Sequence, residues 1–398
     1  MTLTRARPIL LLSFGHACVD VYQGTVAALV PYFVAERAYG YAAASGVVLA
    51  ASLLSSLVQP LFGALTDRWA LPWLLPLSTL TAGAGVALGG LAGSYALTLA
   101  AVAVGGVGVA AYHPEAARAA RVAARGSHTA MGWFSLGGNV GFALAPPLVW
   151  AVVGSGGLGA SGLLALPAVA GAVLGGAAVR SAGAVRAAGG PASPPRGRDD
   201  WASFLRLTGA VVCRSVVFVG LSTFVSLYVR ERVGGGSATG TVALFVLYLG
   251  GAVGTVAGGR LADRHGRLRV VRVSYVLTVL AVAGVVLVPG PAVYLCVALT
   301  SAGLYVPFSL HITLGQDYLP RRTGTASGVT LGLAVSVGGL AAPVLGALAD
   351  ATSLRTALLP LVALPAVGRL LLCGLREPAT AAVPPPAAPR AAREADVR

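Results

Sequence analysis

Two short stretches of this chain follow one pattern: Gly63-Ala64-Leu65-Thr66-Asp67-Arg68 and, nearly half the chain later, Gly259-Arg260-Leu261-Ala262-Asp263-Arg264. Each comes at the end of a long apolar run. The glycine lets two helices approach closely, and the aspartate can accept hydrogen bonds from an arginine or from a helix N-terminus. The arginine keeps its charge at a wet surface. The repeated pattern predicts two related halves.

A second feature repeats at a similar distance. His113 lies in Tyr112-His113-Pro114-Glu115 at the end of one apolar run, and His311 ends the corresponding run in the second half. Because proline has no backbone N–H, we expect Pro114 to bend or end its helix. The bend would bring His113 and Glu115 to an inner surface.

The composition places the chain in a lipid bilayer. It has 398 residues, a mean hydropathy of +0.82, 56% hydrophobic residues and only 10% charged residues. Apolar runs long enough to span a membrane as helices recur roughly every 30 residues, about 12 in all. They show no sustained alternation of apolar and polar residues, which argues against a β-barrel. We therefore predict an all-α integral membrane protein with 12 spans in two six-helix bundles.

The formal charge of +15 does not indicate nucleic-acid binding, because the basic residues are not gathered on one soluble domain. All 28 are arginines, and 23 of them fall at the ends and loops on one side of the predicted spans. Arg214 lies within a span, and four lie on the other side: Arg37, Arg230, Arg232 and Arg355. Arginine collects on the cytoplasmic side of membrane proteins. This predicts a multi-pass inner-membrane protein with both termini in the cytoplasm.

The composition also predicts the division of the chain. Residues 1–180 form the N-terminal bundle, and residues 181–202 form a cytoplasmic linker rich in Ala, Gly, Pro, Ser and Arg. Residues 203–376 form the C-terminal bundle. Residues 377–398 form a disordered cytoplasmic tail, because their Ala, Pro and Arg cannot build an apolar core.

Ionisable residues inside apolar runs are the main functional signal. His16 and Asp20 stand four residues apart in the first run, so both lie on one face of a helix. A charge at that depth is costly in contact with lipid, so this face must point inward. Asp20 then either bonds a neighbouring helix or handles protons or substrate. Arg214 occupies nearly the matching position of the seventh run.

The two halves, the paired pattern and the central linker together resemble the major facilitator superfamily. In that family the paired pattern latches the cytoplasmic side and favours the outward-facing state. The resemblance assigns this role to six residues: Gly63, Asp67, Arg68, Gly259, Asp263 and Arg264. A weaker echo, Gly346-Ala347-Leu348-Ala349-Asp350, falls on the opposite face, as inverted repeats within each half predict.

Further stretches are similar to the fosmidomycin resistance branch of drug exporters in this superfamily. They are Phe14-Gly15-His16-Ala17-Cys18-Val19-Asp20, Tyr112-His113-Pro114-Glu115, Gly137-Gly138-Asn139-Val140-Gly141, and Arg214 followed by Thr223-Phe224-Val225-Ser226-Leu227-Tyr228. Val225-Ser226 departs from the branch, where aromatic or proline-containing residues are expected.

The resemblance also suggests roles for the residues of spans one, four, seven and ten, which line the central cavity in the superfamily. Proton coupling falls to Asp20, Glu115, His113 and His16. Substrate binding falls to Arg214, His113, Asn139, His311 and Tyr112. Arg214, helped by His113, would hold an anion while Asp20 and Glu115 exchange protons. Alternatively, a buried pair of Arg214 with a carboxylate only holds the halves in register.

The sequence favours a transporter over an enzyme. It has no phosphate-binding Gly-x-x-x-x-Gly-Lys loop and no His/Cys cluster with catalytic-metal spacing, so we predict no cofactor and no metal. An ion gradient must then drive transport.

The first hypothesis is a monomeric proton-coupled antiporter that exports a small toxic, fosmidomycin-like anion. The alternatives are an importer or facilitator of a metabolite and a receptor or scaffold. The expected partners are the small-molecule substrate, protons and the lipid bilayer, without nucleic acid.

Overall fold

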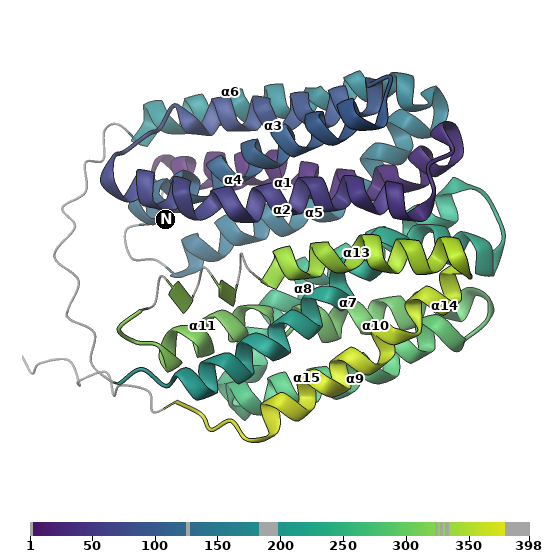
Figure 1. The fold of residues 1–398 in the computed structure, drawn as a ribbon. Coiled ribbons are helices and arrows are strands. Elements are labelled where there is room, and N and C mark those ends of the chain that lie inside the picture. The colour runs from purple at the N-terminus through teal and green to yellow at the C-terminus, as the bar shows by residue number, and fades with distance from the viewer. Residues whose placement is uncertain are drawn as a thin grey trace, which may run out of the picture.

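The computed structural model describes residues 3–124, 128–182, 198–322, 325–326, 329–330 and 334–378. Within these residues the chain forms helices and short connections without a β-strand, which confirms the all-α prediction (Figure 1). Eleven helical segments are long and apolar enough to cross a membrane. The apolar segment Ser336–Ala351 is shorter within the described residues and provides the remaining span. The chain is therefore a multi-pass membrane protein.

The first half of the chain forms one helical layer of Figure 1 and the second half forms the other. The first half contains α1 (Leu3–Arg37), α2 (Tyr41–Arg68), α3 (Leu74–Leu91), α4 (Tyr95–Ala124), α5 (His128–Gly156), the 3₁₀ helix η1 (Leu158–Ala165) and α6 (Leu166–Ala182). The second half contains α7 (Trp201–Val233), α8 (Ser237–His265), α9 (Arg267–Leu287), the 3₁₀ helix η2 (Gly290–Ala292), α10 (Val293–Tyr305), α11 (Phe308–Tyr318), α13 (Ala334–Ala351), α14 (Leu354–Leu358) and α15 (Pro360–Cys373).

The two halves contact each other mainly through α2 against α13 and α5 against α8. Polar contacts reinforce these pairs at the end of the bundle that carries α14, away from the N-terminus (Figure 1). There Asp350 accepts hydrogen bonds from the backbone N–H groups of Tyr41 at 2.7 Å and Ala42 at 2.9 Å. The indole of Trp150 donates to Ser237 at 3.1 Å. We call this region the α14 end of the interface.

The Asp350 contact has a clear physical basis. The first N–H groups of a helix have no partner within it, and the positive end of the helix dipole favours a carboxylate there. Gly40, just before α2, provides no side-chain cap of its own. Asp350 of one half therefore caps the first turn of α2 in the other. The residue that the sequence singled out as a weak echo lies at the junction of the halves.

Two proline positions behave differently from each other. Pro114 does not end its helix, since α4 continues to Ala124; a membrane bundle can satisfy the freed carbonyl in other ways. The apolar run that His311 ends, which hydropathy predicts as one helix, is instead broken. α10 ends at Tyr305 and α11 begins at Phe308, on either side of Pro307. The missing N–H of Pro307 interrupts the hydrogen-bond ladder at this point.

Candidate functional site

Helices α1 and α5 approach closely at the Gly-rich stretch of α5. A Cβ atom at residue 138 would lie 2.5 Å from Oδ2 of Asp20 and 2.7 Å from Cε1 of His16, so only glycine leaves room for these two side chains. Gly137 and Gly141 face the α1 backbone in the same way. The Gly-Gly-x-x-Gly pattern on α5 thus makes the space in which polar groups of α1 sit.

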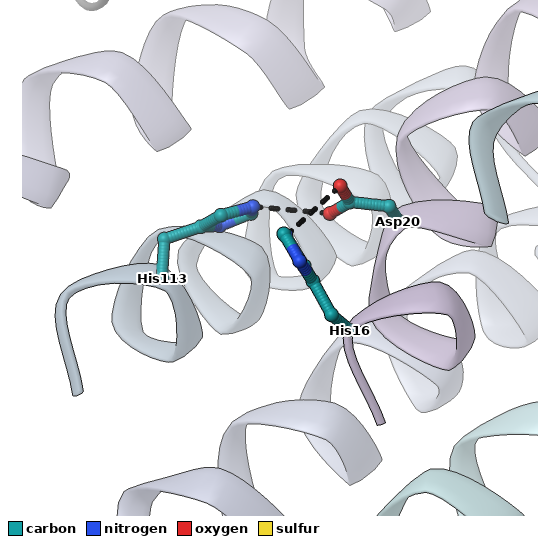
Figure 2. Close-up of side chains that lie close together, drawn as sticks. All are labelled: His16, Asp20 and His113. Atoms are coloured by element: carbon teal, nitrogen blue, oxygen red, sulfur yellow. Dashed lines mark ion pairs between the residues drawn. The ribbon is translucent and has the colours of Figure 1, made fainter. Parts of the chain in front are cut away.

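Three ionisable side chains meet in this space (Figure 2). Nε2 of His16 lies 3.2 Å from Oδ2 of Asp20, one turn along α1. Nε2 of His113, from α4, lies 3.0 Å from Oδ1 of the same carboxylate. Oδ1 has no hydrogen bond of ordinary geometry, so we interpret its contact with His113 as an ion pair rather than a directed hydrogen bond. We call these three residues the Asp20 cluster.

The outer nitrogens of both imidazole rings contact backbone carbonyls. Nδ1 of His16 lies 2.9 Å from the carbonyl oxygen of Phe134 on α5. Nδ1 of His113 lies 2.8 Å from the carbonyl oxygen of Val109, one turn earlier on α4. These contacts fix the orientation of each ring, and they turn both Nε2 atoms toward Asp20.

The surroundings of the cluster are largely apolar. The ring of His16 stacks on Phe134 with centroids 4.3 Å apart, and Tyr112 stacks at 6.1 Å. The side chains of His16 and Asp20 are only 10% and 12% exposed, whereas that of His113 is 22% exposed. His113 is therefore the member of the cluster most open to water.

The cluster also bears on the prediction that there is no metal. One ligand atom from each of its three residues lies within 4.8 Å of the others, a spacing that would also admit a metal ion. The imidazole nitrogens, however, already contact the carboxylate directly at 3.0 and 3.2 Å. Within the described residues, the cluster is therefore a set of three ionisable groups that contact one another.

Arg214 lies in a separate place, at the break between α10 and α11. Its Nη1 donates to the carbonyl of Leu304 at 3.1 Å, in the last turn of α10. Its guanidinium lies 5.1 Å from the centroid of the Phe308 ring, at the start of α11. The residue is 7% exposed, and its Nε has no hydrogen bond. Among the residues that the structure describes, Arg214 forms no ion pair.

His311 lies on α11, in the same half of the molecule as Arg214. It is 1% exposed, and neither ring nitrogen has a hydrogen-bond partner in the described structure. The ring of Tyr275 stands edge-on to it at 5.8 Å. Among the described residues, the second half thus holds a buried cation and an imidazole without a hydrogen-bond partner, and no carboxylate is paired with either.

The other predicted site residues are placed elsewhere. Glu115 is fully buried, forms an ion pair with Arg118 and accepts from the backbone N–H of Leu71 at 3.4 Å. It supports the turn between α2 and α3, away from the Asp20 cluster. Asn139 faces α8, where its Oδ1 would lie 3.0 Å from a Cβ atom at Gly251. In the described structure, the residues that the resemblance places around one central cavity thus contact different partners, and no ion pair joins the Asp20 cluster to Glu115 or Arg214.

The predicted latch residues are only partly visible. The side chain of Asp67 lies outside the described residues. The guanidinium of Arg68 lies 4.8 Å from the centroid of the Trp69 ring. Asp263 and Arg264 are exposed, and no ion pair involves them in the part of the chain that the structure covers.

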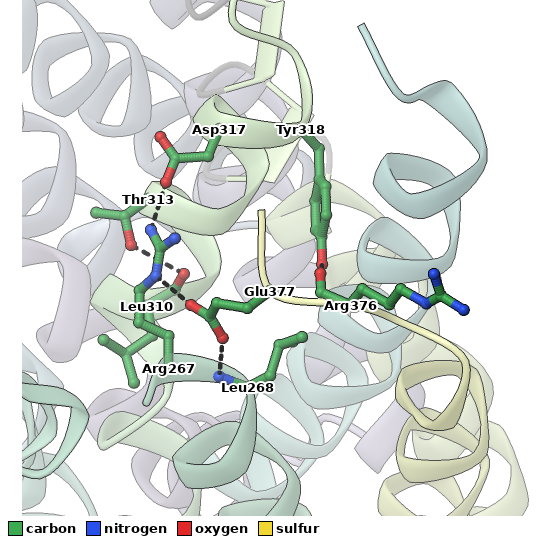
Figure 3. A network of polar contacts seen from close by, with 8 residues as sticks. All are labelled: Arg267, Leu268, Leu310, Thr313, Asp317, Tyr318, Arg376 and Glu377. Atoms are coloured by element: carbon green, nitrogen blue, oxygen red, sulfur yellow. Dashed lines mark hydrogen bonds and ion pairs between the residues drawn. The ribbon is translucent and has the colours of Figure 1, made fainter. Parts of the chain in front are cut away.

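A polar network near the second pattern was not predicted (Figure 3). Arg267 at the start of α9 contacts Asp317 at 2.6 Å and Glu377 at 2.7 Å. Glu377 also accepts from the backbone N–H of Leu268 at 3.1 Å, so it caps α9. The network ties α9, α11 and the segment after α15 together. Arg267 follows the second pattern closely in the sequence, but nothing in the sequence marks Glu377 as its partner.

Comparison with known proteins assigns the chain and its fold to a family. Residues 12–343 match the family model of the Major Facilitator Superfamily. The chain belongs to this superfamily, and it is a membrane transporter rather than an enzyme.

Particular relatives narrow the resemblance. The chain is 30% identical over 373 residues to the fosmidomycin resistance protein of Escherichia coli (strain K12), covering 91% of each chain. It is 29% identical over 384 residues to the uncharacterized MFS-type transporter YfnC of Bacillus subtilis (strain 168), covering 92% of each chain.

Solved structures share the fold. A bacterial homolog of the human lysosomal transporter Spinster, in an inward-facing and occupied conformation, matches with a TM-score of 0.76 at 16% identity, covering 94% of this chain and 97% of that one. The nucleoside transporter NupG matches with a TM-score of 0.69 at 14% identity, covering 93% and 98%.

The first prediction concerns the space at Gly138. Gly138→Ala should push a methyl group into Asp20 and His16 and destabilise the protein by about 1–3 kcal/mol, as overpacking does. Gly132→Ala, on the same helix, is the matched control because nothing lies within 4 Å of a Cβ there. It should leave stability unchanged or raise it by up to about 1 kcal/mol. Thermal unfolding in detergent measures both, and equal effects would contradict the close packing.

Proposed function

We propose that this transporter is a proton-coupled antiporter of the inner membrane that exports a small anionic compound of the fosmidomycin type. The observation that carries the proposal is the Asp20 cluster, a carboxylate held between two imidazoles inside the membrane-spanning helices. Buried ionisable groups of this kind are costly, and in membrane proteins they mark proton or substrate pathways. The antiporter works as a monomer.

The anionic character of the substrate is supported by Arg214. A buried guanidinium without an ion pair is unfavourable, and it gains most from an anion that arrives from outside the protein. His311 adds an imidazole whose nitrogens have no partner. The similarity to the fosmidomycin resistance protein favours a phosphonate. The substrate would reach Arg214 from the central cavity when the break between α10 and α11 shifts.

Asp20 should be needed for proton coupling, and Arg214 for substrate binding. In vesicles containing the purified protein, Asp20→Asn should lose pH-driven fosmidomycin export yet keep passive exchange. Arg214→Gln should lose both, although its amide can still donate to Leu304. Arg121→Gln removes an exposed arginine and should leave both unchanged.

Several outcomes of this assay would contradict the proposal. Uphill export by Asp20→Asn would exclude the proton role of Asp20. Full transport by a folded Arg214→Gln variant would exclude anion binding by Arg214. The same assay on Glu115→Gln decides whether this more distant carboxylate takes part in coupling. Accumulation of the substrate on the alkaline side, into which the protons flow, would show symport and favour an importer.

The orientation proposed for the chain follows the arginine asymmetry. Both termini and the linker around Ser193 should lie in the cytoplasm. In a variant without the four native cysteines, an impermeant thiol reagent added to intact cells should label a cysteine at Gly236 but not one at Ser193. Gly236 lies between α7 and α8, at the opposite end of α7 from the linker. Labelling in the reverse order would overturn the orientation.

We also propose that polar contacts hold the two halves together at the cytoplasmic end in one conformation and at the α14 end in the other. Gly63, Asp67 and Arg68, with Gly259, Asp263 and Arg264, would hold the cytoplasmic end closed. Asp350 would hold the α14 end closed through its contact with α2. Each latch favours one of two conformations, so removing it should shift the population toward the other.

The two latches should therefore respond with opposite sign. Spin labels at Gly93 and Gly236 report the separation of the halves at the α14 end, and neither glycine has atoms within 4 Å of an ideal Cβ. Asp350→Asn should shift the distance distribution toward longer values. The double variant Asp67→Asn, Asp263→Asn should shift the distribution toward shorter values, because the equilibrium between the two conformations changes by roughly 1–3 kcal/mol. Shifts of the same sign would contradict alternating latches.

A further inference from the structure

The geometry of the Asp20 cluster determines how many protons its two imidazoles and its carboxylate carry. A carbonyl oxygen only accepts hydrogen bonds. Nδ1 of His16 and Nδ1 of His113 each face such an oxygen at 2.9 and 2.8 Å, so both Nδ1 atoms must carry a proton. In a neutral imidazole the other nitrogen, Nε2, then presents only a lone pair.

Both Nε2 atoms nevertheless lie 3.0–3.2 Å from an oxygen of Asp20. An ionised carboxylate offers only lone pairs, so each of these contacts is repulsive unless a proton lies on one of the two atoms. A protonated Asp20 could supply one contact and not the other. Two contacts therefore require two protons, whether these sit on the rings or on the carboxylate.

The charge of the cluster follows from this count. With two protons, two imidazolium rings and one carboxylate give +1. With one proton the cluster is neutral and one contact is repulsive, and with none the charge is −1 and both are repulsive. Such closely coupled groups titrate as a unit. The geometry of this structure corresponds to the state with two protons.

The neighbouring groups leave this count unchanged. The other titratable side chain whose ring contacts both imidazoles is Tyr112 on α4, which is neutral as an ordinary phenol. Glu115 on α4 is already paired with Arg118. In the described structure, no other charged side chain from α2, α3, α5, α6 or α7 lies within ion-pair distance of Asp20.

We infer that the Asp20 cluster binds two protons together and releases both in each transport cycle. His16 and Asp20 share one helix and cannot separate easily. His113 comes from α4 and is the most exposed of the three, so its contact with Asp20 breaks when a proton leaves. Loss of the protons thus loosens α4 from α1. The inference extends the proposed function, because it gives the number of coupling protons and their binding atoms.

Nitrogen NMR of the purified transporter tests the proton count without any substrate. The protein is labelled with ¹⁵N-histidine, and the signals are assigned with His16→Gln and His113→Gln; exposed His265 is an internal reference. At low pH both rings should give imidazolium signals. On raising the pH both should lose the proton from Nε2 and keep that on Nδ1, the less usual neutral form. In Asp20→Asn both should lose the Nε2 proton at a lower pH than in the wild type.

The alternatives give different spectra. A single charged ring at every pH, or neutral rings protonated on Nε2, would overturn the two-proton count. Spectra that change when a chelator is added would show a bound metal ion instead and would also overturn it. A reversal-potential measurement in vesicles then counts protons per substrate, with two expected and one contradicting joint release. The NMR result stands whether or not the proposed substrate is transported, so the two proposals fail separately.

Discussion

The presence of a carboxylate inside a membrane-spanning helix is the constraint that shapes the first half of this transporter. A charged side chain at such a depth costs about 3 kcal/mol on insertion scales if it faces lipid. Asp20 avoids this through imidazoles from α1 and α4 and through the space that Gly138 leaves on α5. Three helices thus meet at one carboxylate, and their spacing depends on it.

The second half contains a polar group of the opposite charge. Arg214 lies where Pro307 interrupts the tenth span, and it donates to a carbonyl near that interruption. Irregular backbone at membrane depth is tolerated only where protein or a water-filled cavity satisfies it. The Nε of this guanidinium has no hydrogen bond in the described structure. The break, the charge and the unpartnered ring of His311 therefore belong to one region.

The sequence predicted the parts of this structure that depend on local patterns. Twelve spans followed from hydropathy, and the pairing of the halves followed from the repeat at Gly63 and Gly259. The closeness of His16 and Asp20 followed from helical spacing. These features depend on periodicity, which one sequence contains in full.

The remaining features depend on how helices rotate against one another. Hydropathy places Glu115 and His113 at the end of one apolar run. Because they are two residues apart on a helix, their side chains point in different directions. One therefore pairs with Arg118 and the other with Asp20. In the same way, the chain does not reveal that Glu377 folds back onto Arg267 across more than 100 residues. Such contacts depend on how distant helices pack against one another, and no local sequence pattern encodes that packing.

The contact of Asp350 with α2 and the contacts within the Asp20 cluster differ in strength. This difference bears on how the protein changes conformation. The contact of Asp350 with α2 is exposed and joins the halves, and a carboxylate at a helix N-terminus contributes only about 0.3–1 kcal/mol. The Asp20 cluster is buried within one half, where water screens its charges far less. The change of proton number proposed for this cluster would therefore have a larger energetic effect than the surface contact between the halves. Since α1 also contacts α7, movement of α1 against α4 can reach the second half directly.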